Sequence, residues 1–182
     1  MNKNLRKMVL LAIYVALAIV LDYIKEMLPF LNMPQGGSIN IALIPIVFAS
    51  FHLGSLYGFL AGLLWRAISS IMGLNNYFIS IMQYVLDYIV PSSIIGLASI
   101  LYKKKNNLET ILGIIIVMII RTLSIVLSGA YYWVGDLASG SKEAWIGSLV
   151  YNLPYSIATC LMLVLIIPML LKVFKNRIKR YV

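Results

Sequence analysis

Long apolar runs set the fold class of this chain. Of its 182 residues, 62% are hydrophobic and 12% are charged, and the mean hydropathy is +0.93. A soluble domain of this length needs no such excess of apolar surface, whereas about 20 consecutive apolar residues span a bilayer as a helix. We therefore predict an all-α integral membrane protein in which residues 1–182 form a single domain.

Turn-forming residues divide the apolar runs into six predicted transmembrane helices. They cover residues 5–28, 39–51, 55–72, 77–102, 108–132 and 144–175, with Pro-, Gly-, Asn- and Ser-rich or basic segments between them. Pro45 predicts a kink in the second helix, and His52 is expected in the turn that follows it. The basic start ahead of an apolar run is also typical of a signal peptide. Because that run continues to membrane length, we interpret it as a retained first span.

The distribution of basic residues predicts the orientation in the membrane. Of the 15 Lys and Arg residues, eleven flank the predicted helices on the side of the two termini, and Lys25 and Lys142 lie on the other side. Cytoplasmic loops carry the excess of Lys and Arg, so both termini are predicted to be cytoplasmic in a multi-pass plasma-membrane protein. The net charge of +9 does not indicate nucleic acid as a partner, because these residues gather at helix ends next to lipid.

One carboxylate, Asp87, stands within an otherwise apolar predicted helix. A charge inside the bilayer is costly unless it is paired, and it marks a functional site by default. Tyr84 and Tyr77 precede it by three and ten residues on the same helical face, and Tyr88 is adjacent. A carboxylate among phenol rings suits a flat organic cation. We therefore predict that these four residues bind such a ligand.

Other helices contribute further predicted ligand contacts. On the fifth predicted helix, Gly129 would let a flat ring approach the backbone, Trp133 would stack on that ring, and Arg121 lies near the same stripe. Asn152 on the sixth helix offers a two-pronged amide contact to a heteroaromatic edge. Trp65 on the third helix completes the predicted site.

Two structural alternatives compete with this interpretation. Asp87 could form an internal ion pair with Arg66 or Arg121, because opposite charges 4 Å apart gain about 4 kcal/mol at an effective dielectric near 20. Trp133 and neighbouring tyrosines could form an aromatic belt at the membrane interface. Both alternatives remain open at the level of sequence.

Catalysis by this chain is not expected. The sequence has one His, one Cys, no acidic cluster for a metal, no Gly-x-Ser-x-Gly elbow and no phosphate-binding Gly-x-x-x-x-Gly-Lys-Ser/Thr loop. We therefore predict no enzyme activity, no metal and no cofactor, and any ATP hydrolysis would belong to a partner. On the first predicted helix, Ala12 and Ala16 form a small-residue groove for another helix, either of a partner or of this chain.

Together these features resemble the thiamine-specific substrate-binding membrane subunit (S component) of energy-coupling factor vitamin transporters. The resemblance covers the whole chain and rests on residues 33–38, Tyr77, Asp87, Tyr88, the spacing of Arg121, Gly129 and Trp133, and residues 151–152. It implies that Asp87 faces the cationic thiazolium, that Trp133 stacks on the ligand and that Asn152 bonds the aminopyrimidine. The first outer loop would act as a lid.

The resemblance also implies partners and a place in the cell. Ala12 and Ala16 would dock on the transmembrane coupling subunit, which works with two ATPase subunits in a bacterial plasma membrane. The chain has Asp87, Ile125 and Gly147 where that family usually has Glu, His and Tyr. The open alternatives are an S component for another small vitamin or a pyrimidine precursor, a stand-alone uniporter, or a small membrane enzyme.

Overall fold

The computed structural model describes residues 3–32, 37–74, 77, 79–102, 106–133, 135 and 137–174. Within these residues the fold is helical, and an isolated bridge between Asn32 and Ser38 is the extent of β pairing. The elements are α1 (Lys3–Glu26), the 3-10 turn η1 (Pro29–Leu31), α2 (Leu43–Leu53), α3 (Ser55–Ile71), α4 (Ile81–Tyr84), the π-helical turn η3 (Val85–Ile89), α5 (Val90–Ile95), α6 (Asn107–Tyr132) and α7 (Lys142–Val173). The all-helical class is confirmed.

Among the described residues, three helices, α1, α6 and α7, are long and apolar enough to cross a membrane. The 24 residues of α1 extend about 36 Å, which exceeds the roughly 30 Å of a hydrocarbon core. The helices α2 and α3 and the stretch Ile81–Ile95 are apolar but shorter. A helical segment lies in each of the six predicted regions, and three of them reach full membrane length.

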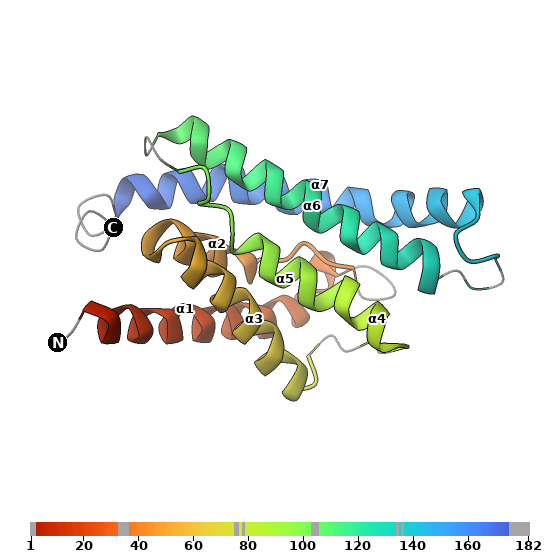
Figure 1. Cartoon of the computed structure of the whole chain (residues 1–182), viewed down its shortest axis with the longest axis horizontal. Coiled ribbons are helices and arrows are strands. Elements are labelled where there is room, and N and C mark those ends of the chain that lie inside the picture. The colour runs from red at the N-terminus through yellow and green to blue at the C-terminus, as the bar shows by residue number, and fades with distance from the viewer. Residues whose placement is uncertain are drawn as a thin grey trace.

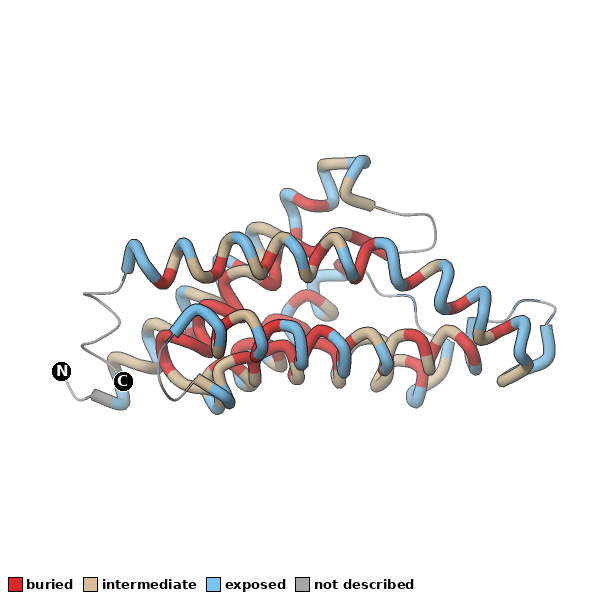
Figure 2. The backbone as a smooth tube through the Cα atoms, turned by 90° about the horizontal axis from the view of Figure 1, so that it is seen from above, coloured by how far each residue is buried: buried red, intermediate tan, exposed pale blue. Residues whose placement is uncertain are grey.

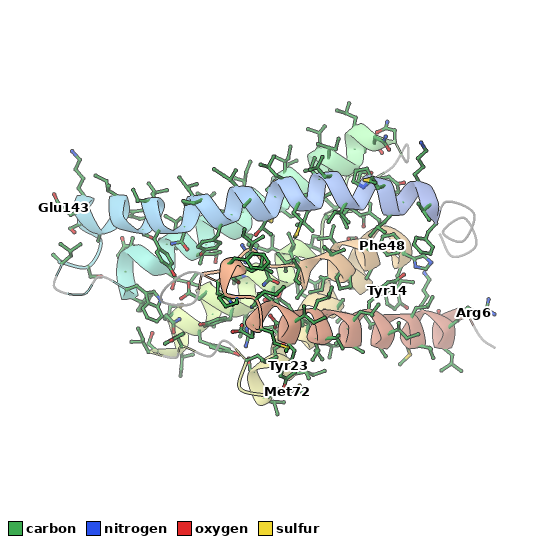
Figure 3. All side chains as sticks on the ribbon, turned by 180° about the vertical axis from the view of Figure 1, so that it is seen from behind. Arg6, Tyr14, Tyr23, Phe48, Met72 and Glu143 are labelled. Atoms are coloured by element: carbon green, nitrogen blue, oxygen red, sulfur yellow. The ribbon has the colours of Figure 1, made fainter. Side chains whose placement is uncertain are left out.

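The long helices lie on two sides of α2 and α5, whereas α3 crosses α1 and its end projects beyond it (Figure 1). α6 packs mainly on α7, and α1 lies across the molecule from that pair, with α2, α3 and α5 between them. The start of α1, the start of α6 and the end of α7 lie at the same end of the molecule, which we call the terminal end. Figure 3 shows Arg6 and Phe48 near this end and Glu143 at the opposite end.

Buried residues turn inward on every long helix and exposed residues turn outward (Figure 2). The core includes fully buried Ile46, Ile95, Ile114, Leu163 and Ile167. The outward faces carry large apolar side chains, for example on α1, α6 and α7 (Ile13, Leu17, Ile119, Leu165 and Met169). Such extensive exposed apolar surface is typical of a protein surrounded by lipid.

Close backbone contact brings α3 against α5. A Cβ on Gly62 would lie 1.8 Å from the carbonyl oxygen of Ser92, and one on Gly58 would lie 2.2 Å from that of Gly96. Any larger residue at either position would therefore separate the two helices. This small-residue seam places α5 in the centre of the molecule.

Three expectations about helix boundaries are wrong. The predicted helix 77–102 is broken into α4, η3 and α5, and turns occupy Gly96–Leu101. The second helix begins at Leu43 rather than near 39, so Pro45 falls in its first turn, where a missing N–H breaks no helical bond. His52 lies within α2 instead of in a turn, and its ring contacts the hydroxyl of Tyr14.

Candidate functional site

A cavity of about 370 Å³ opens in the half of the molecule away from the terminal end. Its walls come from α1, the start of α2, α3, the η3–α5 stretch, α6, α7 and residues 37–40. We call this part of the molecule the cavity half and the rest the terminal half. Of the nine predicted ligand contacts, seven line the cavity: Trp65, Asp87, Tyr88, Arg121, Gly129, Trp133 and Asn152.

The backbone around Asp87 departs from the α-helix ahead of Pro91. In the π-helical turn η3, N–H groups bond the carbonyl five residues back instead of four. In that pattern the carbonyl of Leu86 faces Pro91, which has no N–H to donate. The hydroxyl of Ser124 on α6 donates to this carbonyl instead, at 2.7 Å. A side chain of a second helix therefore supports the irregular turn that carries the carboxylate.

Neutral donors hold the carboxylate of Asp87. Its Oδ2 accepts a hydrogen bond from Nε2 of Gln83 at 2.7 Å and from Nε1 of Trp133 at 2.8 Å. No ion pair joins it to Arg121 in the described part of the chain. Gln83 is fully buried and was not among the predicted residues, although its position four residues before Asp87 on one helix face was a usable signal.

Arg66 and Tyr88 form the wall beside this carboxylate. The guanidinium of Arg66 lies 4.8 Å from the ring centroid of Tyr88. Its Nη2 donates to the carbonyl of Leu74 and its Nε donates to the hydroxyl of Ser70, both at 2.9 Å. These contacts fix Arg66 against α3 and keep the Tyr88 ring at the cavity.

Two predicted tyrosines lie outside the cavity lining. The hydroxyl of Tyr84 contacts Ser70, and its ring packs against Tyr88 with centroids 5.1 Å apart. Tyr77 is exposed, and its ring meets Trp133 edge to face at 6.0 Å. Neither ring lines the cavity as expected, because Tyr77 precedes the first residue of α4 and the hydroxyl of Tyr84 turns to Ser70 of α3.

Gly129 and Asn152 are engaged by the α6–α7 contact. A Cβ on Gly129 would lie 2.1 Å from the hydroxyl oxygen of Ser148, so this glycine permits helix packing as well as lining the cavity. Asn152 donates to the carbonyl of Ser148 at 2.8 Å and accepts a hydrogen bond from the hydroxyl of Tyr155. The amide that was predicted to bind a ligand is thus held in one orientation by its own helix.

Sequence reasoning missed a buried ion pair in the cavity wall. Nζ of Lys25 lies 2.8 Å from Oδ1 of Asp22 and 3.2 Å from Oε1 of Glu26, and the hydroxyl of Ser69 donates to Oδ2 of Asp22 at 3.2 Å. Asp22 and Lys25 are each 1% exposed. Opposite charges three residues apart near the end of an apolar run were the available signal. Lys25, which was counted among the charges on the outer side, is therefore buried in the cavity wall.

Other predicted positions fall into two groups. Ile125 and Gly147 both line the cavity, and a Cβ on Gly147 would meet no atom within 4 Å. Ala12 and Ala16 are exposed on α1 and do not line the cavity.

The lid prediction for the first outer loop falls largely on residues 33–36, which lie outside the described residues. No group of His, Cys, Asp and Glu among the described residues is arranged to hold a metal.

Comparisons with known proteins agree on one family. Residues 8–179 match the thiamine transporter protein family. The chain is 32% identical over 180 residues to the thiamine transporter ThiT of Bacillus subtilis, with 93% of this chain and 92% of the relative covered. A solved structure of ThiT from Listeria monocytogenes superposes with a TM-score of 0.82 at 26% identity, covering 97% of this chain and 99% of that one.

Proposed function

The chain belongs to the thiamine transporter protein family, and we propose that it binds thiamine as the substrate-binding component of an energy-coupling factor uptake transporter. In this role the chain captures the vitamin in the cavity and performs no chemistry on it. Partner subunits supply the energy of ATP hydrolysis. The homologues are named as transporters, which accords with a role that is not enzymatic.

One observation carries the proposal: Asp87 lines the cavity and is held by neutral donors. The N–H groups of Gln83 and Trp133 orient its carboxylate without neutralising it. A half-buried negative charge that has no cationic partner among the described residues favours a cationic ligand. The thiazolium of thiamine is a flat organic cation, and the rings of Tyr88 and Trp133 lie beside the place it would occupy.

The proposed orientation follows from the charge pattern. With the terminal end in the cytoplasm, the cavity opens to the outside, as capture of an external vitamin requires. The exposed face of α1 that carries Ala12 and Ala16 is then available within the membrane for a transmembrane coupling subunit. This arrangement separates the ligand cavity from the docking face.

Calorimetry on the purified chain tests the ligand. Thiamine is expected to bind far more tightly than its neutral aminopyrimidine fragment, because the fragment lacks the cation that faces Asp87. Riboflavin, a neutral vitamin of larger size, is expected not to compete. Equal affinity for thiamine and the neutral fragment would favour a pyrimidine precursor as the ligand.

Uptake measurements test the partner. Ala12→Trp or Ala16→Trp is expected to abolish thiamine uptake by cells while the purified variant binds thiamine normally. Ala67→Trp, at an exposed alanine of α3, is the matched control and is expected to leave uptake intact. Normal uptake by both α1 variants would exclude this face of α1 as the docking surface for the coupling subunit. Purification from native membranes without any ATPase subunit would instead indicate a stand-alone uniporter.

A further inference from the structure

The side chain of Gln83 connects the carboxylate of Asp87 to the main chain ahead of α4. Gln83 is fully buried and does not line the cavity; α4 lies on the side of the molecule away from the terminal end (Figure 1). Besides its bond to Asp87 at 2.7 Å, Nε2 donates to the carbonyl of Tyr77 at 3.2 Å. Oε1 accepts from the N–H of Ile79 at 3.1 Å. One amide therefore contacts a charged group of the cavity wall and two main-chain groups outside it.

An amide matches these three partners. The carboxylate of Asp87 and the carbonyl of Tyr77 need donors, and the N–H of Ile79 needs an acceptor. The glutamine side chain supplies two N–H donors and one carbonyl oxygen, and the three contacts together fix which way the group points. A carboxylate of the same length would offer no donor to Asp87, and a methionine would fill the space without any of the three bonds.

The main chain ahead of α4 is also held by residues that line the cavity. The N–H of Tyr77 donates to the hydroxyl of Tyr88 at 3.1 Å, and the ring of Tyr77 meets that of Trp133 edge to face at 6.0 Å. Trp133 in turn donates to Oδ2 of Asp87 at 2.8 Å, the oxygen that also accepts from Gln83. Tyr77 itself is 53% exposed. An exposed residue is thus linked to the carboxylate through two side chains.

We propose that Gln83 is a positioning residue, which couples the carboxylate of Asp87 to the main chain at Tyr77 and Ile79. The inference rests on the proposed function and deepens it, because Asp87 is the group that would face the thiazolium. Coupling between two sites is reciprocal. While Tyr77 and Ile79 are in place, Gln83 holds the carboxylate ready for a cation, and a cation bound to Asp87 in turn holds Tyr77 and Ile79 in place.

A double-mutant cycle of Gln83→Met and Asp87→Asn, with thiamine binding measured by calorimetry, tests the positioning role. In the chain with Asp87, Gln83→Met is expected to weaken binding by about 10-fold, as for one lost hydrogen bond to a charged group. In the Asp87→Asn chain the same change is expected to weaken binding by less than about 3-fold, because the charge through which Gln83 acts is absent. Equal losses in both chains, or unchanged affinity in Gln83→Met, would overturn the positioning role alone.

Ser80→Ala is the matched control within the same short helix. The hydroxyl of Ser80 accepts a hydrogen bond from the main-chain N–H of Gln83 and caps α4, so the variant disturbs the start of the helix and leaves the amide in place. Thiamine affinity is expected to change by less than about 3-fold. A loss equal to that of Gln83→Met would assign the effect to the start of α4 and overturn the role of the amide.

Hydrogen exchange of the Ile79 amide, followed by mass spectrometry in detergent, tests the coupling to the main chain. Thiamine is expected to slow this exchange in the wild type by about 5-fold or more, and to leave it unchanged in Gln83→Met. Exchange in the wild type that thiamine does not alter overturns the coupling, and this measurement decides if Gln83→Met does not fold. Absence of thiamine binding to the wild type overturns the proposed function and the positioning role together.

Discussion

The terminal half and the cavity half are built from the same helices but by different means. In the terminal half, α2, α6 and α7 are regular, and residues such as Ile114, Leu163 and Ile167 fill the core. In the cavity half, the helical stretch 81–95 is interrupted by a π-helical turn. Five charged side chains of that half line one cavity in the described part of the chain: Asp22, Lys25, Arg66, Asp87 and Arg121.

The contrast shows what each half requires of the backbone. Apolar packing needs only close approach, which Gly58, Gly62 and Gly113 allow without disturbing a helix. The carboxylate that lines the cavity lies in a π-helical turn, and this turn leaves a carbonyl that Ser124 satisfies. The cavity half should therefore respond to changes of charge and hydrogen bonding, and the terminal half to changes of volume.

The largest effect is expected from Lys25→Met, which leaves Asp22 buried without its cation. Breaking a buried ion pair by removing one partner lowers the free energy of unfolding by about 3–5 kcal/mol. Thermal unfolding in detergent measures the loss. The control Lys142→Met, at an exposed lysine, should leave the melting temperature almost unchanged. Equal melting temperatures of the two variants would show that the pair does not stabilise the cavity half.

Asp87→Asn is expected to act on binding rather than on folding. Loss of a charge pair worth about 4 kcal/mol at 4 Å would weaken thiamine binding by up to about 1000-fold. The amide still offers an oxygen to Gln83 and Trp133, so the melting temperature should hardly change. Calorimetry provides the affinity, with Glu109→Gln, a carboxylate of the terminal half, as the control. Unchanged affinity would reduce Asp87 to a structural residue.

Gly113→Ala is expected to lower stability and to leave thiamine binding unchanged, which is the reverse of the effect of Asp87→Asn. The added Cβ would lie 2.1 Å from the carbonyl oxygen of Ala98 in the terminal half. Such overpacking is expected to lower the free energy of unfolding by about 1–3 kcal/mol, while the folded protein retains its thiamine affinity. Gly147→Ala, where a Cβ meets no neighbour, is the matched change in the cavity wall. It should leave stability unchanged or slightly raised. Equal destabilisation by both substitutions would contradict the distinction between a terminal half that responds to changes of volume and a cavity half that responds to changes of charge and hydrogen bonding.

Trp133→Phe is expected to have the smallest effect on energy. It removes one hydrogen bond to Asp87 and part of the stacking surface, which together weaken thiamine binding by about 10-fold. It should also remove most of the tryptophan fluorescence quenching on thiamine addition. Trp145→Phe serves as control, because Trp145 packs against Tyr131 and does not line the cavity. Quenching that persists in Trp133→Phe would exclude the stacking role.

Much of the cavity was predictable because its residues conflict with a membrane environment. Asp87, Arg121 and Asn152 are polar within apolar runs, and such groups turn towards the protein interior. The ion pair between Asp22 and Lys25 was not predicted because both residues lie near a helix end, where charged side chains commonly reach water. Tyr77 was misplaced because the prediction began the helix at residue 77, whereas α4 begins at Ile81, and Tyr84 was misplaced because its hydroxyl contacts Ser70 of α3.

The sequence by itself determined the helical membrane class, the main helical segments and the residues too polar to face lipid, because apolar length and local polarity depend on neighbouring residues alone. Only the tertiary structure decided where Asp87 points, which donors hold it and which charges pair. Those outcomes depend on Ser124, Trp133 and Ser69, which lie 38, 46 and 47 positions from the residues they contact. No local pattern encodes contacts between such distant positions.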